Sequence, residues 1–388
     1  MGRHRLAAPA AAIAAAAAAL SSCGLPGALG GEPDPPGWER VSARGLVLKG
    51  PVEAYQPDRL IASGSFQGHD CIVEITTAGG IRCLPDTDGP QQIPSATALS
   101  SNGDVILAVE WQDMADATPP AVWAGFDLEL NRESLQPGPD GDATAFVDAA
   151  TSDDEATVVG TGPSAACPSG AVAAWSVLVP GLRRFGGQGP CVDATSPSQL
   201  HADTDDAWLL VAGPVYRPGT SPDADRPIQA WVASADDERW ATATWQPVEL
   251  PQPFDRVTDV VVALDGMVAG SRADRPVLAT VDGRRATAVE VPDESLDRAD
   301  PTVLVADPGV GGRAVVLAMQ TPRGVRLWTQ RQSGWYAVDG PRGHLTSAIE
   351  MEGALTYVAT RDDAGEVALW VRRRSATETS RPAYRALP

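Results

Sequence analysis

Short apolar runs that end in Pro or Gly recur along the 388 residues of this chain, and few stretches show a helical period. The outermost run of each repeat can be followed by eye. These runs start at Trp38, Ile81, Ser134, Leu182, Trp245, Ala288, Trp335 and Tyr384, at intervals of 43, 53, 48, 63, 43, 47 and 49 residues. A four-stranded unit of a β-propeller takes about 40 to 50 residues, so the interval of 63 marks an insertion.

The intervals predict an all-β chain that folds as a β-propeller of seven four-stranded blades, with residues 38–388 forming one domain. The composition agrees, because 38 Gly and 34 Pro make up roughly a fifth of the chain and suit many turns and few long helices. Since the intervals are uneven, eight blades or a sandwich of two sheets remain the alternatives.

Within each repeat the expected second strand is an apolar run that ends in small residues, which would let sheets pack closely near the axis. These runs start at Leu60, Val105, Thr157, Trp208, Met267, Ala314 and Leu355. The expected third strands carry Trp123, Trp175, Trp231, Trp328 and Trp370. We expect the tryptophans to pack between blades, since one ring buries about 150 to 250 Å². Stacking on a glycan is the alternative for any one of them.

Two further patterns locate individual strands. Residues 224–231 and 273–280 share Ala-Asp-Arg-Pro at an offset of 49 residues, which predicts the starts of equivalent third strands in neighbouring blades. Residues 327–341 carry Trp328 and Trp335 on two runs around a polar turn closed by Gly334. This pattern predicts the outer hairpin of the sixth blade.

Residues 1–23 have the features of a targeting segment. Residues 3–5 give a positive start, and residues 6–20 an Ala-rich apolar stretch shorter than a membrane-spanning helix. The final Leu-Ser-Ser-Cys, residues 20–23, resembles the lipobox of bacterial lipoprotein signal peptides. The resemblance implies that Cys23 is acylated, is the new N-terminus after cleavage, and attaches the protein to a membrane through two or three acyl chains.

The rest of the N-terminal region and the charge fit an extracytoplasmic location. Residues 24–37 are rich in Gly and Pro and predict a disordered linker. The net charge of −20 and the pI near 4.5 disfavour nucleic-acid partners. We expect a lipid-anchored monomer on the extracytoplasmic face of the cell membrane of a bacterium.

The turns that follow two expected third strands share a pattern. Residues 234–240 carry Ser, Asp and Trp, and residues 280–283 carry Thr, Asp and Gly. These turns resemble degenerate Asp-box repeats of sialidase-like propellers, although the second turn lacks the Trp. In that family the motif tightens this hairpin and lies far from the active site. The resemblance therefore implies a propeller fold and does not imply sialidase activity.

Five cysteines are present, and assigning Cys23 to the lipid leaves Cys71, Cys83, Cys167 and Cys191. An even number of cysteines in an oxidising compartment predicts two disulfides, with three pairings open. Cys71 with Cys83 would link the two outer strands of one hairpin. Cys167 with Cys191 would join two loops on one face of the propeller.

No metal site and no cofactor are expected. The sequence has no Cys-x-x-Cys spacing, and His69, His201 and His344 stand apart from one another. Carboxylate clusters such as residues 86–89 and 203–206 do not continue into a calcium-binding loop. Turn formation explains these clusters better, because Asp and Gly adopt the required conformations.

Catalytic residues cannot be assigned from the sequence. Glycoside cleavage needs paired carboxylates, and sialidase-like catalysis also needs several arginines. The nearest candidates are Glu110, Asp113, Glu350 and Glu352, with Arg217, Arg226 and Arg275. No motif fixes any of them to such a role. The chain also lacks a Gly-x-Ser-x-Gly elbow, a phosphate-binding Gly loop and a His-Glu-x-x-His motif.

Three successive repeats have long connections between their second and third strands, at residues 111–120, 162–170 and 213–227. In a propeller these insertions would gather on one sector of one face. Loops on rigid scaffolds carry function, and Trp, Tyr and Arg are favoured at binding hot spots. The candidate ligand-binding residues are Trp111, Asp113, Tyr216 and Arg217. The alternative is that the insertions are merely tolerated at the surface.

Taken together, these features predict a membrane-tethered extracytoplasmic lipoprotein that acts as a binding scaffold. Its ligand would be a protein or a cell-envelope glycan on the loop-rich face, held without catalysis. A sialidase-like glycoside hydrolase is the alternative function, so enzymatic activity stays an open question at this point.

Overall fold

The computed structural model describes residues 35–84, 96, 98–101, 105–110, 121–126, 130–133, 145–151, 156–177, 182–185, 189–192, 200–204, 208–214, 227–234, 244–262, 266–306, 316–331, 334–351 and 355–373. By their internal contacts residues 1–33 and 34–388 form separate units, and every described residue belongs to the second. The regular elements of the described ranges are β-strands. No helix in these ranges is long and apolar enough to cross a membrane.

The strands pair in chain order, each antiparallel to the next, and form five four-stranded sheets and one eight-stranded sheet within the described residues. In sequence the strands are β1 (Glu39–Val41), β2 (Leu46–Gln56), β3 (Arg59–Phe66), β4 (His69–Thr76), β5 (Ile81–Cys83), β6 (Ala98–Ser101), β7 (Val105–Glu110), β8 (Ala121–Phe126), β9 (Asn131–Glu133), β10 (Ala145–Thr151), β11 (Ala156–Ser164), β12 (Cys167–Val177), β13 (Leu182–Phe185), β14 (His201–Thr204), β15 (Trp208–Pro214), β16 (Ile228–Ser234), β17 (Thr244–Val248), β18 (Arg256–Val261), β19 (Met267–Arg272), β20 (Arg275–Asp282), β21 (Arg285–Val289), β22 (Val303–Val305), β23 (Val316–Thr321), β24 (Gly324–Arg331), β25 (Gly334–Asp339), β26 (His344–Met351), β27 (Leu355–Arg361) and β28 (Val367–Arg373).

The eight-stranded sheet consists of two four-stranded groups, β2–β5 and β26–β28 with β1. These groups are joined by the single pair Leu48–Val367 between β2 and β28. Strand β1 lies at the outer edge of β28, with Arg40 opposite Trp370. The buried Trp38 indole fixes this segment by donating to the carbonyl of Asp339, with 2.9 Å between nitrogen and oxygen. The beginning of the described chain therefore completes its last sheet.

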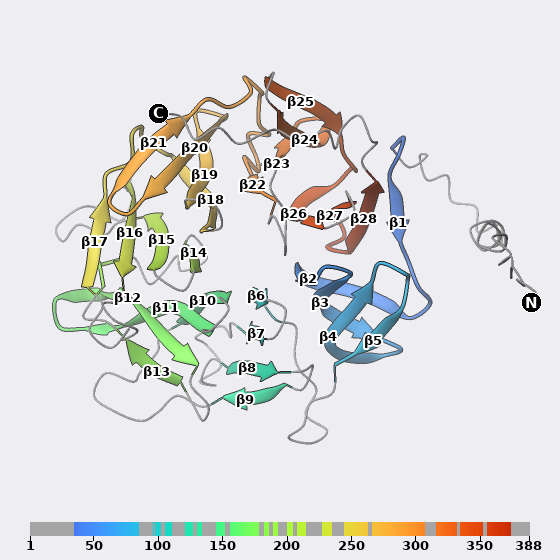
Figure 1. Cartoon of the computed structure of the whole chain (residues 1–388), viewed down its shortest axis with the longest axis horizontal. Coiled ribbons are helices and arrows are strands. Elements are labelled where there is room, and N and C mark those ends of the chain that lie inside the picture. Colours follow the sequence, from blue (N-terminus) through green and yellow to red (C-terminus); the bar gives the residue numbers. More distant parts are fainter. Residues whose placement is uncertain are drawn as a thin grey trace, which may run out of the picture. The chain divides into compact units, whose positions relative to one another are not determined.

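The four-stranded groups follow one another around a ring (Figure 1). The first strand of each group contacts the first strand of the next, and β26 contacts β2. Seven clusters of buried apolar residues each combine side chains from two consecutive groups, and one of them joins β26–β28 to β2–β5. The body of the protein is thus a β-propeller. The number of blades in the whole chain stays a prediction, because these groups come from the described residues alone.

The predicted strand order within each group is confirmed. The runs expected as second strands form β3, β7, β11, β15, β19, β23 and β27. The five tryptophans lie on third strands and pack between consecutive groups, as expected. Trp175 is fully buried and meets Phe146 edge-on, with ring centroids 5.1 Å apart. The two Ala-Asp-Arg-Pro segments precede or open third strands, β16 and β20.

Some predicted positions are wrong or lie outside the described residues. The outer strand near Ser134 is β9, which ends one residue earlier at Glu133. The run at Tyr384 lies outside the described ranges. The small residues of the second strands are predicted to allow close packing between sheets. Two of them also allow close approach of strands within one sheet. At Gly64 and Gly270 a side chain would collide with the carbonyl oxygens of Val47 and Arg256, which lie on the first strand of the same sheet.

The hairpin predicted at residues 327–341 is formed by β24 and β25, with Trp328 opposite Ala337 and Gln330 opposite Trp335. Gly334 has a φ of 122°, a conformation that side-chain-bearing residues rarely adopt. Trp328 and Trp335 pack against the core between this group and β18–β21. This observation confirms that both rings serve packing between groups.

Two disulfides are present, as the cysteine count predicts. Cys71 on β4 is bonded to Cys83 on β5, and Cys167 is bonded to Cys191. The first bridge links the two outer strands of the β2–β5 group. For the second bridge the predicted loop position is only partly right, since Cys167 is the first residue of β12 and Cys191 forms a bridge pair with Ala171 of that strand.

Candidate functional site

The predicted ligand-binding residues Trp111, Asp113, Tyr216 and Arg217 lie outside the described residues, as does the predicted lipid-bearing Cys23. Their roles stay predictions. Connections between second and third strands lie at one end of the strands. The turns between first and second strands and between third and fourth strands lie at the other end. The long connection predicted at residues 162–170 is wrong, because β11 extends to Ser164, β12 begins at Cys167 and these two residues pair in a tight hairpin. Residues 111–120 and 215–226 of the other two predicted connections lie outside the described ranges.

The carboxylates and arginines named as catalytic candidates do not converge in the described part of the chain. Glu350 is 3% exposed on β26, and Glu110 is the last residue of β7. Arg275 opens β20 and forms an ion pair with Asp293 at 2.7 Å. The remaining candidates, Asp113, Glu352, Arg217 and Arg226, lie outside the described ranges.

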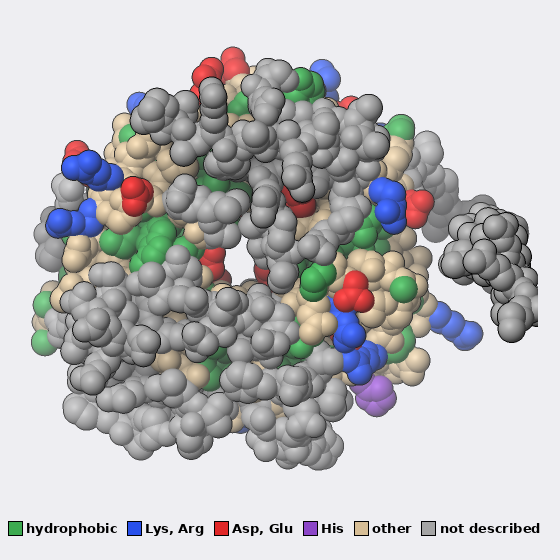
Figure 2. All heavy atoms as spheres, viewed as in Figure 1, with side chains coloured by type: hydrophobic (Ala, Val, Ile, Leu, Met, Phe, Trp, Pro, Cys, Tyr) green, Lys and Arg blue, Asp and Glu red, His purple; other side chains and the backbone are tan. Residues whose placement is uncertain are grey.

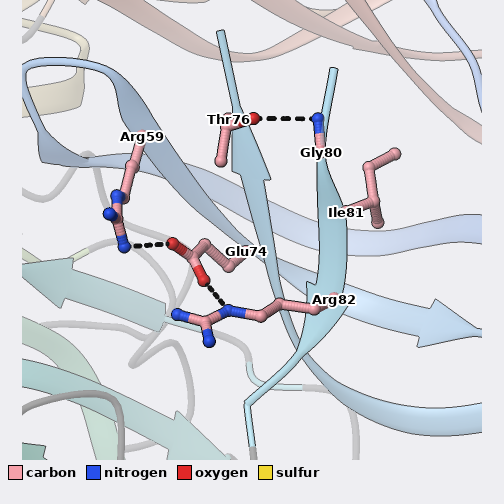
Figure 3. Close-up of a pocket in the computed structure, with 6 residues that line it drawn as sticks. All are labelled: Arg59, Glu74, Thr76, Gly80, Ile81 and Arg82. Atoms are coloured by element: carbon pink, nitrogen blue, oxygen red, sulfur yellow. Dashed lines mark hydrogen bonds and ion pairs between the residues drawn. The ribbon is translucent and has the colours of Figure 1, made fainter. Parts of the chain in front are cut away.

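A pocket of about 390 Å³ opens at the outer strands of the β2–β5 group, and we call it the Arg59–Arg82 pocket. Its lining comes from the start of β3, the end of β4 and the turn into β5 (Figure 3). The lining residues are Arg59, Glu74, Thr76, Gly80, Ile81 and Arg82. The pocket lies where β2 turns into β3 and β4 into β5, at the opposite end of the strands from the predicted insertions.

Strand register brings the charged residues of the pocket together. Glu74 on β4 is directly opposite Arg82 on β5 and opposite Ile61 on β3. Arg59 is two residues before Ile61, so it lies on the same face of the sheet. Ile61 belongs to the buried cluster between β2–β5 and β6–β9. The three charged residues therefore lie on the face of the sheet that packs against the next group. They are nearer to the end of the strands than the buried cluster.

Glu74 is the central residue of the pocket. Its side chain is 2% exposed, its Oε1 lies 2.8 Å from Arg59 Nη1, and its Oε2 accepts a hydrogen bond from Arg82 Nε. A buried carboxylate is costly unless its charge is compensated by partners of this kind. Figure 3 shows both guanidinium groups directed at the one carboxylate, each from a different strand.

Two hydrogen bonds close the turn beside the pocket. Gly80 N–H donates to Thr76 Oγ1, and Thr76 N–H donates to the Gly80 carbonyl, both at 2.8 Å. The Cys71–Cys83 disulfide ties β4 to β5, and the pair Val73–Cys83 lies next to the pair Glu74–Arg82. The arginines are thus held by strands, a tight turn and a covalent bond.

A second set of carboxylates lies on the first strands of three consecutive groups. Asp148 Oδ2 accepts the Ala202 N–H at 2.9 Å, Asp203 Oδ2 accepts the Val262 N–H at 2.6 Å, and Asp259 Oδ2 accepts the Val305 N–H at 2.7 Å. The other oxygen of each carboxylate accepts the N–H of the following residue. Figure 2 shows acidic side chains around the opening in the middle of the ring. Each aspartate therefore connects its own group to the next.

Burial shifts the protonation of these inner residues. It raises the pKa of Asp148 to about 7, against the lowering effect of the Ala202 and Ala149 N–H groups. Burial also raises the pKa of Asp259 well above its usual value, assisted by the charges of Asp148 and Asp203. Burial, with a contribution from Arg256, lowers the pKa of His201 to about 4. Part of each residue still reaches solvent.

Neither set of residues was predicted from the sequence. The aspartates have one sequence signal that could have identified them, since they recur 55 and 56 residues apart. The carboxylate cluster at residues 203–206 predicts a turn, but Asp203 lies on β14.

Of the histidines, His69 opens β4, while His344 lies 3.5 Å from Asp300 and 3.6 Å from Asp363. Among the described residues no group of three or more His, Cys, Asp or Glu could hold a metal ion.

No family model and no curated protein matches the sequence. Solved structures do match the fold. The β-propeller domain of the trilobed protease from Pyrococcus furiosus superposes with a TM-score of 0.51 at 11% identity, covering 85% of this chain and 95% of that one. The Swd1 β-propeller domain of Myceliophteria thermophila gives 0.51 at 12% identity, covering 84% and 98%. Trypanosoma rangeli sialidase gives only 0.42 at 11% identity, covering 87% and 59%. The first two likenesses show the β-propeller fold and nothing about activity.

Proposed function

We propose that the chain is a lipid-anchored extracytoplasmic binding scaffold whose β-propeller holds a protein or cell-envelope glycan ligand without cleaving it. One observation carries this proposal: the Arg59–Arg82 pocket presents guanidinium groups around a carboxylate whose two oxygens are already bonded. A general acid or base must reach the proton that it transfers. Glu74 is engaged by Arg59 and Arg82, one through each oxygen, so it orients these donors. The arrangement supports recognition better than catalysis.

The scaffold around the pocket also supports a binding role. Sites built on strands are held more precisely than sites on loops, and the pocket uses β3, β4 and β5. Disulfide and turn contacts fix these strands relative to one another. A ligand would therefore meet donors that are already in place, which reduces the entropy lost on binding.

The binding role is tested with the full chain purified in detergent. Fractions of envelope glycans and of envelope proteins are immobilised separately, and retention is measured against protein concentration. We expect saturable retention by one fraction, and none with protein unfolded beforehand in urea. If neither glycan nor protein fractions retain the folded chain above the unfolded control, the proposal is wrong.

The tether is a separate part of the proposal and rests on the lipobox-like residues 20–23. Replacing Cys23 by Ala removes the only thiol that this resemblance assigns to acylation. We expect the protein to move from the membrane fraction to the soluble extracytoplasmic fraction. Ser22→Ala is the matched control and should leave the protein in the membrane fraction. A Cys23→Ala protein that stays with membranes would contradict the tether.

The rival function is a sialidase-like glycoside hydrolase. It would require paired carboxylates facing one cavity. In the described ranges Glu350 is buried on β26 and Glu110 ends β7, on groups that are not consecutive. No observation on these residues favours the hydrolase, so its activity is an outcome to be measured.

A further inference from the structure

Part of the Arg82 guanidinium is not used in its bond to Glu74. Arg82 donates to Glu74 through Nε, and its side chain is 55% exposed. No described residue accepts a hydrogen bond from its Nη1 or Nη2, which together form the outer edge of the guanidinium. Figure 3 shows the bond to Glu74 drawn from the Nε of Arg82 and none drawn from its terminal nitrogens. The two nitrogens are therefore available to a ligand as a fork of parallel donors.

The neighbouring charges define which ligand suits this fork. The single charge of Glu74 is divided between Arg59 and Arg82. Arg59 has a second carboxylate near it, since Asp58 Oδ1 lies 3.6 Å from Nε. Arg82 has no other acidic partner in the described residues. The positive charge of Arg82 is thus less compensated than that of Arg59. An anionic ligand would neutralise the charge that remains on Arg82.

A monovalent, planar anion fits better than a phosphate. Carboxylate oxygens match the spacing of a guanidinium edge in two parallel hydrogen bonds. Phosphate can use the same edge, but its second negative charge would be repelled by Glu74, by Asp58 and by a chain of net charge −20. One partly compensated arginine is too little to offset that repulsion.

The pocket is also larger than a carboxylate alone. Its volume of about 390 Å³ lies in the range of small-molecule sites. Thr76 and Gly80 also line the pocket and bond to each other, while the Ile81 side chain lies on the opposite face of the sheet from Arg82 (Figure 3). A cavity of this volume has room for a small ring beside the carboxylate.

We propose that the outer edge of Arg82, oriented by Glu74, binds the carboxylate of an acidic sugar or a small organic acid in the Arg59–Arg82 pocket. This inference rests on the proposed binding role and names the ligand chemistry of one site. The group that touches the ligand is Arg82, while Glu74 is a positioning residue.

Sodium D-glucuronate is the first probe, titrated into the full chain in detergent by isothermal calorimetry. D-glucose is the neutral match, acetate is the carboxylate without a ring, and inorganic phosphate is the divalent anion. We expect glucuronate to bind more tightly than acetate, and glucose and phosphate to bind at least about tenfold more weakly. Phosphate binding as tightly as glucuronate, or glucose binding equally well, would overturn the carboxylate assignment.

Variants assign the binding to Arg82. Arg82→Gln removes the charge and the fork, and should weaken glucuronate binding at least about tenfold. Arg82→Lys keeps the charge without the fork and should give an intermediate loss, so wild-type affinity in the lysine variant would contradict recognition by the edge. Arg285→Gln is the matched control, since Arg285 is an exposed residue on the equivalent outer strand β21. Unchanged tryptophan fluorescence verifies folding in each variant.

The outcomes separate this inference from the proposed function. Retention by an envelope fraction without glucuronate binding would leave the scaffold role standing and refute the carboxylate pocket. Glucuronate binding that depends on Arg82, without retention by any envelope fraction, would support the pocket and refute the envelope-binding role.

Discussion

The carboxylate of Asp148 on β10 accepts the backbone N–H of Ala202 on β14, with 2.9 Å between Oδ2 and nitrogen. The same relationship joins Asp203 to Val262 and Asp259 to Val305. Three consecutive contacts between groups thus depend on a half-buried carboxylate on the first strand of a group. Other contacts between groups use hydroxyls, as in the bond of Val52 N–H to Ser347 Oγ at 3.2 Å.

Asp148 makes the stability of the ring depend on pH. Its pKa of about 7 in the folded chain exceeds its ordinary 3.8, so the folded state binds more protons between these values. The free energy of unfolding contributed by Asp148 therefore falls as the pH rises from about 4 to about 7. Asp148→Asn does not titrate, and we expect it to gain stability relative to wild type over this range, by about 4 kcal/mol at most.

Urea unfolding at a series of pH values, followed by tryptophan fluorescence, measures this difference. The exposed Asp282 provides the control, and Asp282→Asn should keep the pH dependence of the wild type. Parallel pH profiles for wild type and Asp148→Asn would show that the carboxyl at 148 is not buried as described.

His201 has the opposite effect at acid pH. Burial and the charge of Arg256 lower its pKa to about 4, below its ordinary 6.5, so the folded state binds fewer protons between these values. The stability that depends on neutral His201 is present above pH 6.5 and is lost as the pH falls toward 4. We expect His201→Gln to have a shallower loss of thermal midpoint from pH 6.5 to 4 than wild type. An equally steep loss in both proteins would contradict this prediction.

The Cys71–Cys83 bridge closes a loop with a sequence separation of 12 residues. In the chain-entropy account such a loop contributes about 3 kcal/mol to the free energy of unfolding. We expect the Cys71→Ala, Cys83→Ala double variant to lose about this amount in chemical denaturation. The double variant at Cys167 and Cys191, with a separation of 24, should lose a similar amount. Non-reducing mass mapping that finds four free thiols would refute both pairings.

Trp175 tests the packing between groups. It is fully buried, and its ring contacts Phe146 on β10. We expect Trp175→Ala to lower the free energy of unfolding by about 3 to 5 kcal/mol, because a large cavity would remain. Val47→Ala is the control, since Val47 is 51% exposed and should change stability by less than about 0.5 kcal/mol. Similar losses in the two variants would contradict the assigned core.

The sequence predicts the fold well because its signals are local and repeated. Each second strand is a continuous apolar run, and each tryptophan such as Trp123 or Trp231 recurs at the same place in its group. These patterns depend on burial alone, which the residue types express directly. The number of disulfides follows from the cysteine count in the same way.

The pocket and the inner aspartates depend on geometry that the sequence does not express. Glu74 lies between the apolar Val73 and Ile75 on β4, and its partners come from two other strands. Asp148 and Asp259 follow register shifts in β10 and β18, between Phe146 and Asp148 and between Val257 and Asp259. Such a bulge redirects the next side chain, here toward the neighbouring group. No residue pattern identifies a bulge in advance.

The central claim is that the propeller binds its ligand without cleaving it. The most direct measurement incubates the full chain with the envelope glycan that it retains and counts new reducing ends while binding is saturated. The account predicts saturable binding with no reducing ends above those of an unfolded control. Reducing ends that accumulate with time and disappear in Glu350→Gln or Glu110→Gln would contradict it and establish the hydrolase.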